Sequence, residues 1–130
     1  RMKLRAVIFD YGNVICRPPT ERQLSEAAAL CGITVDEFLH AFWRKRREYD
    51  RGTDAREYWR DFAEFIQRDF DDAMVEEMMR REIDFWSDFD PRVLSWTDDL
   101  RRAGLKTSIL SNFLAAGISS SMITVLIIFF

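Results

Sequence analysis

A short apolar run that ends at a carboxylate constrains the fold of this chain more than any other feature. Residues 7–9 (Val-Ile-Phe) are β-branched or aromatic, which predicts a strand buried on both faces. The run stops at Asp10, and the residues just after it include Gly12 and Asn13, which accept the backbone angles of a tight turn. The pattern predicts an acid at the carboxyl end of a buried strand, the edge at which open α/β sheets bind ligands. In the simpler interpretation Asp10 only caps the turn.

A second short strand is predicted at residues 105–110, and it ends at Ser111 and Asn112. Residues 90–104 before it predict a helix, with aspartate as N-cap, proline at the first position and glycine at the end. The order helix, glycine, strand favours parallel pairing with the first strand. Ser111 and Asn112 are therefore expected beside Asp10, where a carboxylate, a hydroxyl, an amide and loop N–H groups can hold a phosphoryl group. Taken alone, Ser111-Asn112 is better explained as a polar turn.

Four helical patterns joined by short links occupy residues 20 to about 86. Thr20 and Thr34 each begin a capping box, and a small α-helical bundle follows from the spacing of the apolar residues. The aromatic stripe of the third helix is interpreted as part of the hydrophobic core, in preference to a cage for a ligand. The methionine-rich face of the fourth helix is interpreted as core filling, in preference to a surface that adapts to varied partners. The residues of these two helices that are predicted to face inward are Tyr58, Trp59, Phe62, Phe65, Ile66, Met74, Val75, Met78, Met79 and Ile83.

Composition narrows the function classes. The chain has 130 residues, which suits one modest domain, and its 19 basic and 22 acidic residues give a net charge of −3, which argues against a general nucleic-acid binder. The basic run at residues 44–47 favours a solvated helix face over a phosphate or RNA patch. Cys16 and Cys31 are expected to be small buried hydrophobes in a reducing compartment. The single histidine, His40, rules out multi-histidine metal sites, and the charged start predicts no signal peptide.

The first run and its turn resemble the first motif of the haloacid dehalogenase-like (HAD) hydrolases, in the Asp-x-Gly-Asn-Val variant of the usual Asp-x-Asp-Gly pattern. Residues 109–112 resemble the second motif of that family, an apolar strand that ends in Ser or Thr. The resemblance implies that Asp10 is the nucleophile and a Mg²⁺ ligand, that the Gly12 carbonyl is a second ligand, and that Ser111 and Asn112 bind phosphate. Gly12 stands where many members carry the acid/base aspartate, so good leaving groups, such as that of a sugar 1-phosphate, would suit this site.

The predicted fold is α/β, a partial HAD-type Rossmann-like parallel sheet with an inserted four-helix cap. Residues 1–16 and 88–130 are predicted to form the incomplete Rossmann-like core, and residues 17–87 the α-helical cap. The resemblance implies a cytoplasmic, Mg²⁺-dependent phosphatase that acts on a small phosphorylated metabolite through an aspartyl-phosphate, with no nucleic-acid partner and no membrane insertion. The alternatives are carbon–halogen hydrolysis by Asp10 without Mg²⁺, and a non-catalytic fragment or binding module.

The family pattern stops after Asn112. HAD hydrolases next require a lysine and then an acidic metal-binding motif, whereas the last lysine here is Lys106 and the last acidic residue is Asp99. Residues 113–130 carry no charge and allow three interpretations: a membrane segment at the lower length limit, a third buried strand from Met122, or foreign sequence after a frameshift or truncation. The last is favoured, with marginal stability or dependence on a partner as the expectation, and it leaves the activity of this 130-residue form open.

Overall fold

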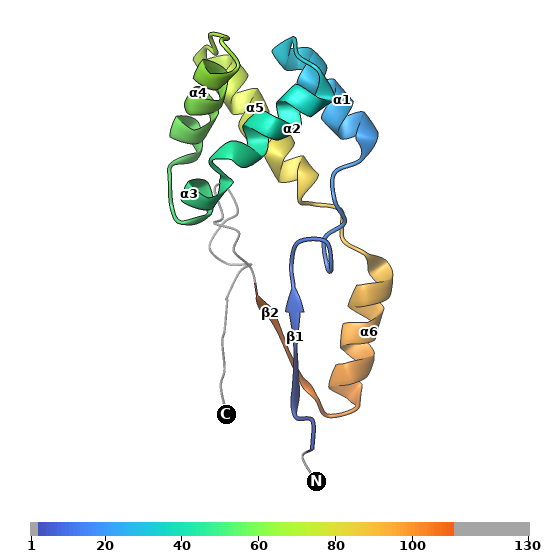
Figure 1. Ribbon diagram of the computed structural model, residues 1–130. Coiled ribbons are helices and arrows are strands. Elements are labelled where there is room, and N and C mark those ends of the chain that lie inside the picture. Colours follow the sequence, from blue (N-terminus) through green and yellow to red (C-terminus); the bar gives the residue numbers. More distant parts are fainter. Residues whose placement is uncertain (1–2, 111–130) are drawn as a thin grey trace. The chain divides into compact units, whose positions relative to one another are not determined.

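The computed structural model describes residues 3–110, and this part of the chain is a mixed α/β structure with six helices and a two-stranded parallel sheet (Figure 1). It divides into two compact units. The sheet unit contains residues 3–18 and 86–110, and the helical unit is the inserted segment Pro19–Phe85. Each unit is described by itself below.

The sheet unit is built on strands β1 (Ala6–Asp10) and β2 (Lys106–Leu110). The strands pair in parallel as predicted, with Ala6 opposite Lys106 and Asp10 opposite Leu110. The connection back to β2 is helix α6 (Pro91–Arg102), which the Asp90 carboxylate caps by accepting from the Arg92 N–H. The parallel direction follows because α6 carries the chain back to the starting edge of the sheet before β2 begins.

Helix α6 covers one face of this sheet. Phe9 is buried on that face, and its ring meets the ring of Trp96 edge-on at 5.5 Å. The Arg101 guanidinium donates to the Thr107 hydroxyl on the same side. The opposite face carries Ile8, which is 57% exposed. The prediction of a strand buried on both faces is therefore wrong for Ile8, because α6, the helix of the sheet unit within residues 3–110, packs on the opposite face.

The helical unit contains five helices rather than the four expected. The capping boxes of Thr20 and Thr34 are both formed, Asp54 caps the fourth helix, and the Asp71 carboxylate accepts from the Met74 N–H at the start of the fifth. The helices are α1 (Glu21–Cys31), α2 (Val35–Arg44), α3 (Arg46–Asp50), α4 (Ala55–Phe65) and α5 (Asp72–Phe85).

Aromatic and sulfur-containing side chains fill the centre of the helical unit. The largest fully buried ones there are Trp59, Phe38, Phe62 and Met78, which confirms the inward face predicted for α4 and part of that predicted for α5. Phe65 is 40% exposed, contrary to the prediction, because it is the last residue of α4. The guanidinium of Arg44 lies 4.2 Å from its ring centre, so this ring is shielded by a cation instead of by the core.

The basic run at residues 44–47 is not the continuous solvated face that was predicted. The helix breaks at Lys45, whose φ of −115° and ψ of 23° are not helical, and this break separates α2 from α3. The change of phase turns Arg46 into the core, where its guanidinium donates to the buried Glu82 carboxylate at 2.5 Å. Arg44 and Lys45 instead pair with Asp61 at 2.6 and 2.8 Å. The run is thus largely neutralised within the helical unit.

Candidate functional site

The candidate site begins at Asp10, the last residue of β1. Its side chain is exposed, and its backbone pairs with Leu110, the last residue of β2. Both strands therefore end at one edge of the sheet, and the chain leaves β2 at the level of the Asp10 carboxylate. Ser111 and Asn112, the predicted phosphate-binding residues, lie outside the described residues, so their contact with Asp10 stays a prediction.

The loop after Asp10 is a single wide turn. The Cys16 N–H donates to the Tyr11 carbonyl at 2.9 Å, which closes the turn over the six residues 11–16. Asn13 adopts the left-handed conformation, with φ of 62°. Asparagine tolerates these angles better than most side chains, and this explains why the turn forms here. The turn predicted from the sequence is present, but Asn13, rather than Gly12, supplies its positive φ.

Aromatic contacts hold this loop in place. The Tyr11 hydroxyl donates to the Trp86 carbonyl, and the Tyr11 and Phe89 rings meet edge-on at 6.1 Å. A Cβ atom at Gly12 would lie 4.0 Å from the Trp86 ring, which is ordinary contact. Burial, with a smaller effect of Cys16, raises the pKa of Tyr11 to about 12. Its hydroxyl therefore remains a hydrogen-bond donor throughout the physiological range.

The chain leaves and re-enters the sheet unit through two segments that pair with each other. The Arg17 N–H donates to the Asp88 carbonyl at 2.7 Å, and the Asp90 N–H donates to the Ile15 carbonyl at 2.8 Å. Between them, Cys16 and Phe89 form an antiparallel bridge. The pairing joins residues 15–17 to residues 88–90, directly beyond the Asp10 loop.

Charged side chains reinforce this pairing. The Arg17 guanidinium lies 3.9 Å from the Asp88 carboxylate and 3.7 Å from that of Asp90, and Arg92 binds Asp90 at 2.9 Å. Hydrogen bonds from Arg92 hold the pKa of Asp90 well below its usual range. Sequence reasoning identified Asp90 as a helix cap but missed its role here, because no local pattern relates Arg17 to residues so distant in the chain.

Asp10 and Gly12 are the two residues that the sequence resemblance implies as Mg²⁺ ligands. Mg²⁺ binds one or two carboxylates together with phosphate oxygens and water, and Asp10 with the Gly12 carbonyl matches that donor type. Within residues 3–110, no three His, Cys, Asp or Glu side chains gather closely enough to hold a metal ion. Lys106 is no substitute for the family's lysine, since it pairs with Ala6 at the other end of the strands, about 13 Å from Asp10 along β1.

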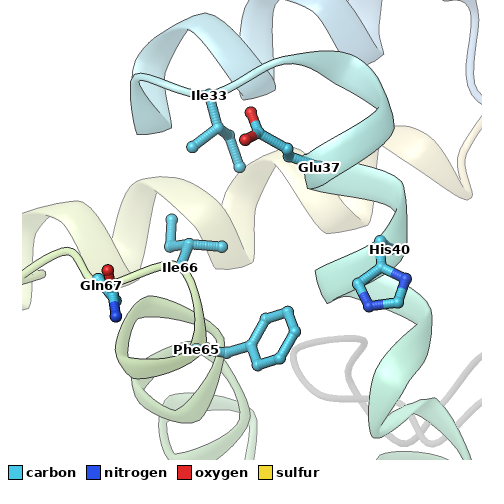
Figure 2. Close-up of a pocket in the computed structure, with 6 residues that line it drawn as sticks. All are labelled: Ile33, Glu37, His40, Phe65, Ile66 and Gln67. Carbon is cyan, nitrogen blue, oxygen red and sulfur yellow. The ribbon is translucent and has the colours of Figure 1, made fainter.

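The remaining sequence candidates lie elsewhere. Cys16 and Cys31 are both buried and free, as predicted, and burial raises the pKa of each thiol. His40 is exposed on α2 and borders a cavity of about 220 Å³ in the helical unit. Figure 2 shows the side chains around this cavity, which come from α2, from the end of α4 and from the residues beside them: Ile33, Glu37, His40, Phe65, Ile66 and Gln67. The cavity is smaller than the roughly 300 Å³ at which small-molecule sites begin.

Comparisons with known proteins returned no match: no protein-family model, no curated protein and no solved structure is significantly similar to the chain. None of the helices within residues 3–110 is long and apolar enough to cross a bilayer.

Proposed function

We propose that this chain carries the nucleophile-bearing part of a HAD-like hydrolase, with a small phosphorylated metabolite as substrate and Mg²⁺ as cofactor. The observation that carries the proposal is the register of the sheet, in which Asp10 is opposite Leu110. This register lets the groups that follow β2 approach the carboxylate that ends β1. It therefore supports a shared site for Asp10, Ser111 and Asn112.

In the proposed reaction an Asp10 carboxylate oxygen attacks phosphorus and the leaving-group oxygen departs, which forms an aspartyl-phosphate. Water then attacks this phosphorus. Inorganic phosphate is released, and the Asp10 carboxylate is regenerated. Ser111 and Asn112, with loop N–H groups, bind the equatorial oxygens on which charge accumulates. Asp10 and the Gly12 carbonyl would hold Mg²⁺, which would reduce the repulsion between the Asp10 carboxylate and the phosphate. Gly12 offers no acid to the leaving group, so substrates with stable leaving groups are favoured.

The test uses beryllium trifluoride, which mimics a phosphoryl group on a carboxylate. With Mg²⁺ present, bound fluoride resonances are expected in the ¹⁹F NMR spectrum of the full chain. The Asp10→Asn variant should lose them, because an amide does not donate to beryllium as a carboxylate does. Asp99→Asn is the matched control, since Asp99 is an exposed aspartate of α6 in the same unit.

Hydrolysis assays separate this proposal from its alternatives. Release of phosphate from a sugar 1-phosphate should require both Asp10 and Mg²⁺, and EDTA should abolish it. Halide release from a 2-haloacid that resists EDTA would instead favour carbon–halogen hydrolysis. Hydrolysis that survives in Asp10→Asn would overturn the mechanism. If the chain neither hydrolyses a substrate nor binds beryllium trifluoride, it is a non-catalytic module.

A further inference from the structure

The loop that follows the proposed nucleophile, Asp10, is hydrogen-bonded to the segment that begins at Trp86. Tyr11 immediately follows Asp10, and its hydroxyl donates to the Trp86 carbonyl. Trp86 is the first residue of the sheet unit after the helical unit. The Tyr11 side chain therefore connects the loop after Asp10 to Trp86, where the chain re-enters the sheet unit.

Two further contacts join the same two segments. The Tyr11 ring lies edge-on to the Phe89 ring, at 6.1 Å and 77°, and the Trp86 ring lies 4.0 Å from the position that a Cβ atom at Gly12 would occupy. The loop's own closing hydrogen bond uses the Tyr11 carbonyl and the Cys16 N–H. Tyr11 thus contributes its hydroxyl, its ring and its backbone to holding one turn.

The returning segment is itself fixed. Asp90 accepts from Arg92 and lies near Arg17, and its N–H donates to the Ile15 carbonyl. A loop tied to such a segment has few conformations, and groups that are already in place lose little free energy when a charged ligand arrives.

We infer that Tyr11 is a positioning residue of the Asp10 site: its bonds to Trp86 and Phe89 hold the Asp10–Gly12 loop against residues 86–90. Occupancy of the site and the order of residues 86–90 are therefore coupled. This inference rests on the proposed function, because the coupling needs a ligand at Asp10.

Amide hydrogen exchange of the full chain tests the inference, first without ligand. Tyr11→Phe keeps the ring and removes the hydroxyl, and peptides that cover residues 11–17 and 86–90 should exchange about fivefold faster, as the loss of one ordinary hydrogen bond implies. Tyr58→Phe is the matched control, because the Tyr58 hydroxyl also donates to a backbone carbonyl, that of Phe42, within the helical unit. It should leave both peptides unchanged. Unchanged exchange of both peptides in Tyr11→Phe would overturn the inference.

The second arm adds Mg²⁺ and beryllium trifluoride. In the wild-type chain we expect slower exchange at residues 11–17 and also at residues 86–90. Tyr11→Phe should bind the probe about fivefold more weakly and lose the protection at 86–90, whereas Tyr58→Phe should keep both. Wild-type affinity and protection in Tyr11→Phe would overturn the positioning role while leaving the proposed function intact. A wild-type chain that shows no protection anywhere would overturn both.

A variant that fails to fold is recognised by circular dichroism. Phe89→Leu then replaces Tyr11→Phe, because it removes only the ring contact and leaves the hydroxyl bond in place. Phe89→Leu should speed amide exchange at residues 11–17 and 86–90 and weaken beryllium trifluoride binding, each by a smaller factor than the one expected for Tyr11→Phe. No shift in either measurement would count against the coupling.

Discussion

Gly12 has room for a side chain. Among residues 3–110, a Cβ atom there would meet only the Trp86 ring, at 4.0 Å, and Gly12 is not among the glycines with positive φ. Neither steric contact nor backbone conformation therefore requires glycine at this position. The absence of an acid beside Asp10 is a chemical property of the site rather than a demand of the fold.

We predict that Gly12→Asp folds normally and gains activity on substrates with poor leaving groups. An acid that protonates the departing oxygen contributes about 10²-fold or more, so hydrolysis of an alkyl phosphate should rise while that of p-nitrophenyl phosphate changes little. Gly12→Asn, which has the same size without the acid, is the control. An equal rise in both variants, or in neither, would contradict this assignment of the missing acid.

Glu82 is the charged residue on which the helical core depends most. Its buried carboxylate accepts from Arg46, from the Tyr49 hydroxyl and from the Trp59 indole N–H. Glu82→Leu would remove the buried carboxylate that binds the Arg46 guanidinium at 2.5 Å, and Asp50, at 3.3 Å, would remain. We predict a loss of about 3–5 kcal/mol in the free energy of unfolding, measured by urea denaturation.

The double variant Arg46→Met, Glu82→Leu provides the control for this prediction. It removes both charges, so no buried cation is left without its carboxylate, and it should cost less than Glu82→Leu alone. If the two variants are equally destabilised, the loss comes from side-chain packing and not from the unpaired charge.

At the scale of elements, helix termini marked by capping residues follow from the sequence, whereas a break and change of phase inside a helical pattern do not. The threonine caps of α1 and α2 were predicted correctly because a capping box is a local pattern of four residues. The break at Lys45 was missed because residues 35–49 keep a helical period throughout. What favours the break is the distant Glu82, which binds Arg46 in the core, and no local spacing reports such a partner.

Helix α5 carries an ion-pair cluster on its exposed side. Glu77 accepts from both Arg80 and Arg81 at 2.7 Å. These arginines, Arg80 first, lower the pKa of Glu77 from 4.5 to about 2. A carboxylate whose pKa is lower in the folded state than in the unfolded state stabilises the folded protein. Its full contribution to the free energy of unfolding is present above the unfolded-state pKa, and it is lost as the pH falls towards the folded-state pKa.

We therefore predict that Glu77→Gln lowers the melting temperature by a few °C at pH 7, and that the difference from the wild type shrinks between pH 4.5 and pH 2. Thermal unfolding followed by circular dichroism at several pH values measures both. Glu64→Gln, at an exposed glutamate of α4, controls for the substitution itself. A difference that does not change with pH would show that the arginines do not hold the Glu77 carboxylate.

At the scale of the whole molecule, the two units differ in how much they bury. The helical unit encloses Trp59, Phe38 and Phe62 almost completely. In the sheet unit, Leu4 is 68% exposed, Ile8 is 57% exposed, and α6 has no buried residue. Burial of apolar area is the main driving force of folding, so the helical unit is expected to hold most of the stability.

We predict that residues 19–85, expressed alone, are helical and unfold cooperatively with urea. A chain in which Phe38→Ala empties the centre of this core should lose about 3–5 kcal/mol and provides the control. Strong binding of a hydrophobic dye together with a non-cooperative transition would contradict the prediction, because it would mean that the unit needs the rest of the chain to fold.

The sequence by itself determined the features that depend on near neighbours. These are the strand that ends at Asp10, the capped helices, the glycine before β2, and hence a parallel pair of strands, because turn chemistry and apolar spacing act over a few residues. Only the tertiary structure decided the burial of Arg46, the exposure of Ile8, and the hydrogen bond from the Tyr11 hydroxyl to the Trp86 carbonyl. Each of these depends on partners distant in the chain, and burial and hydrogen bonding with such partners override local preference.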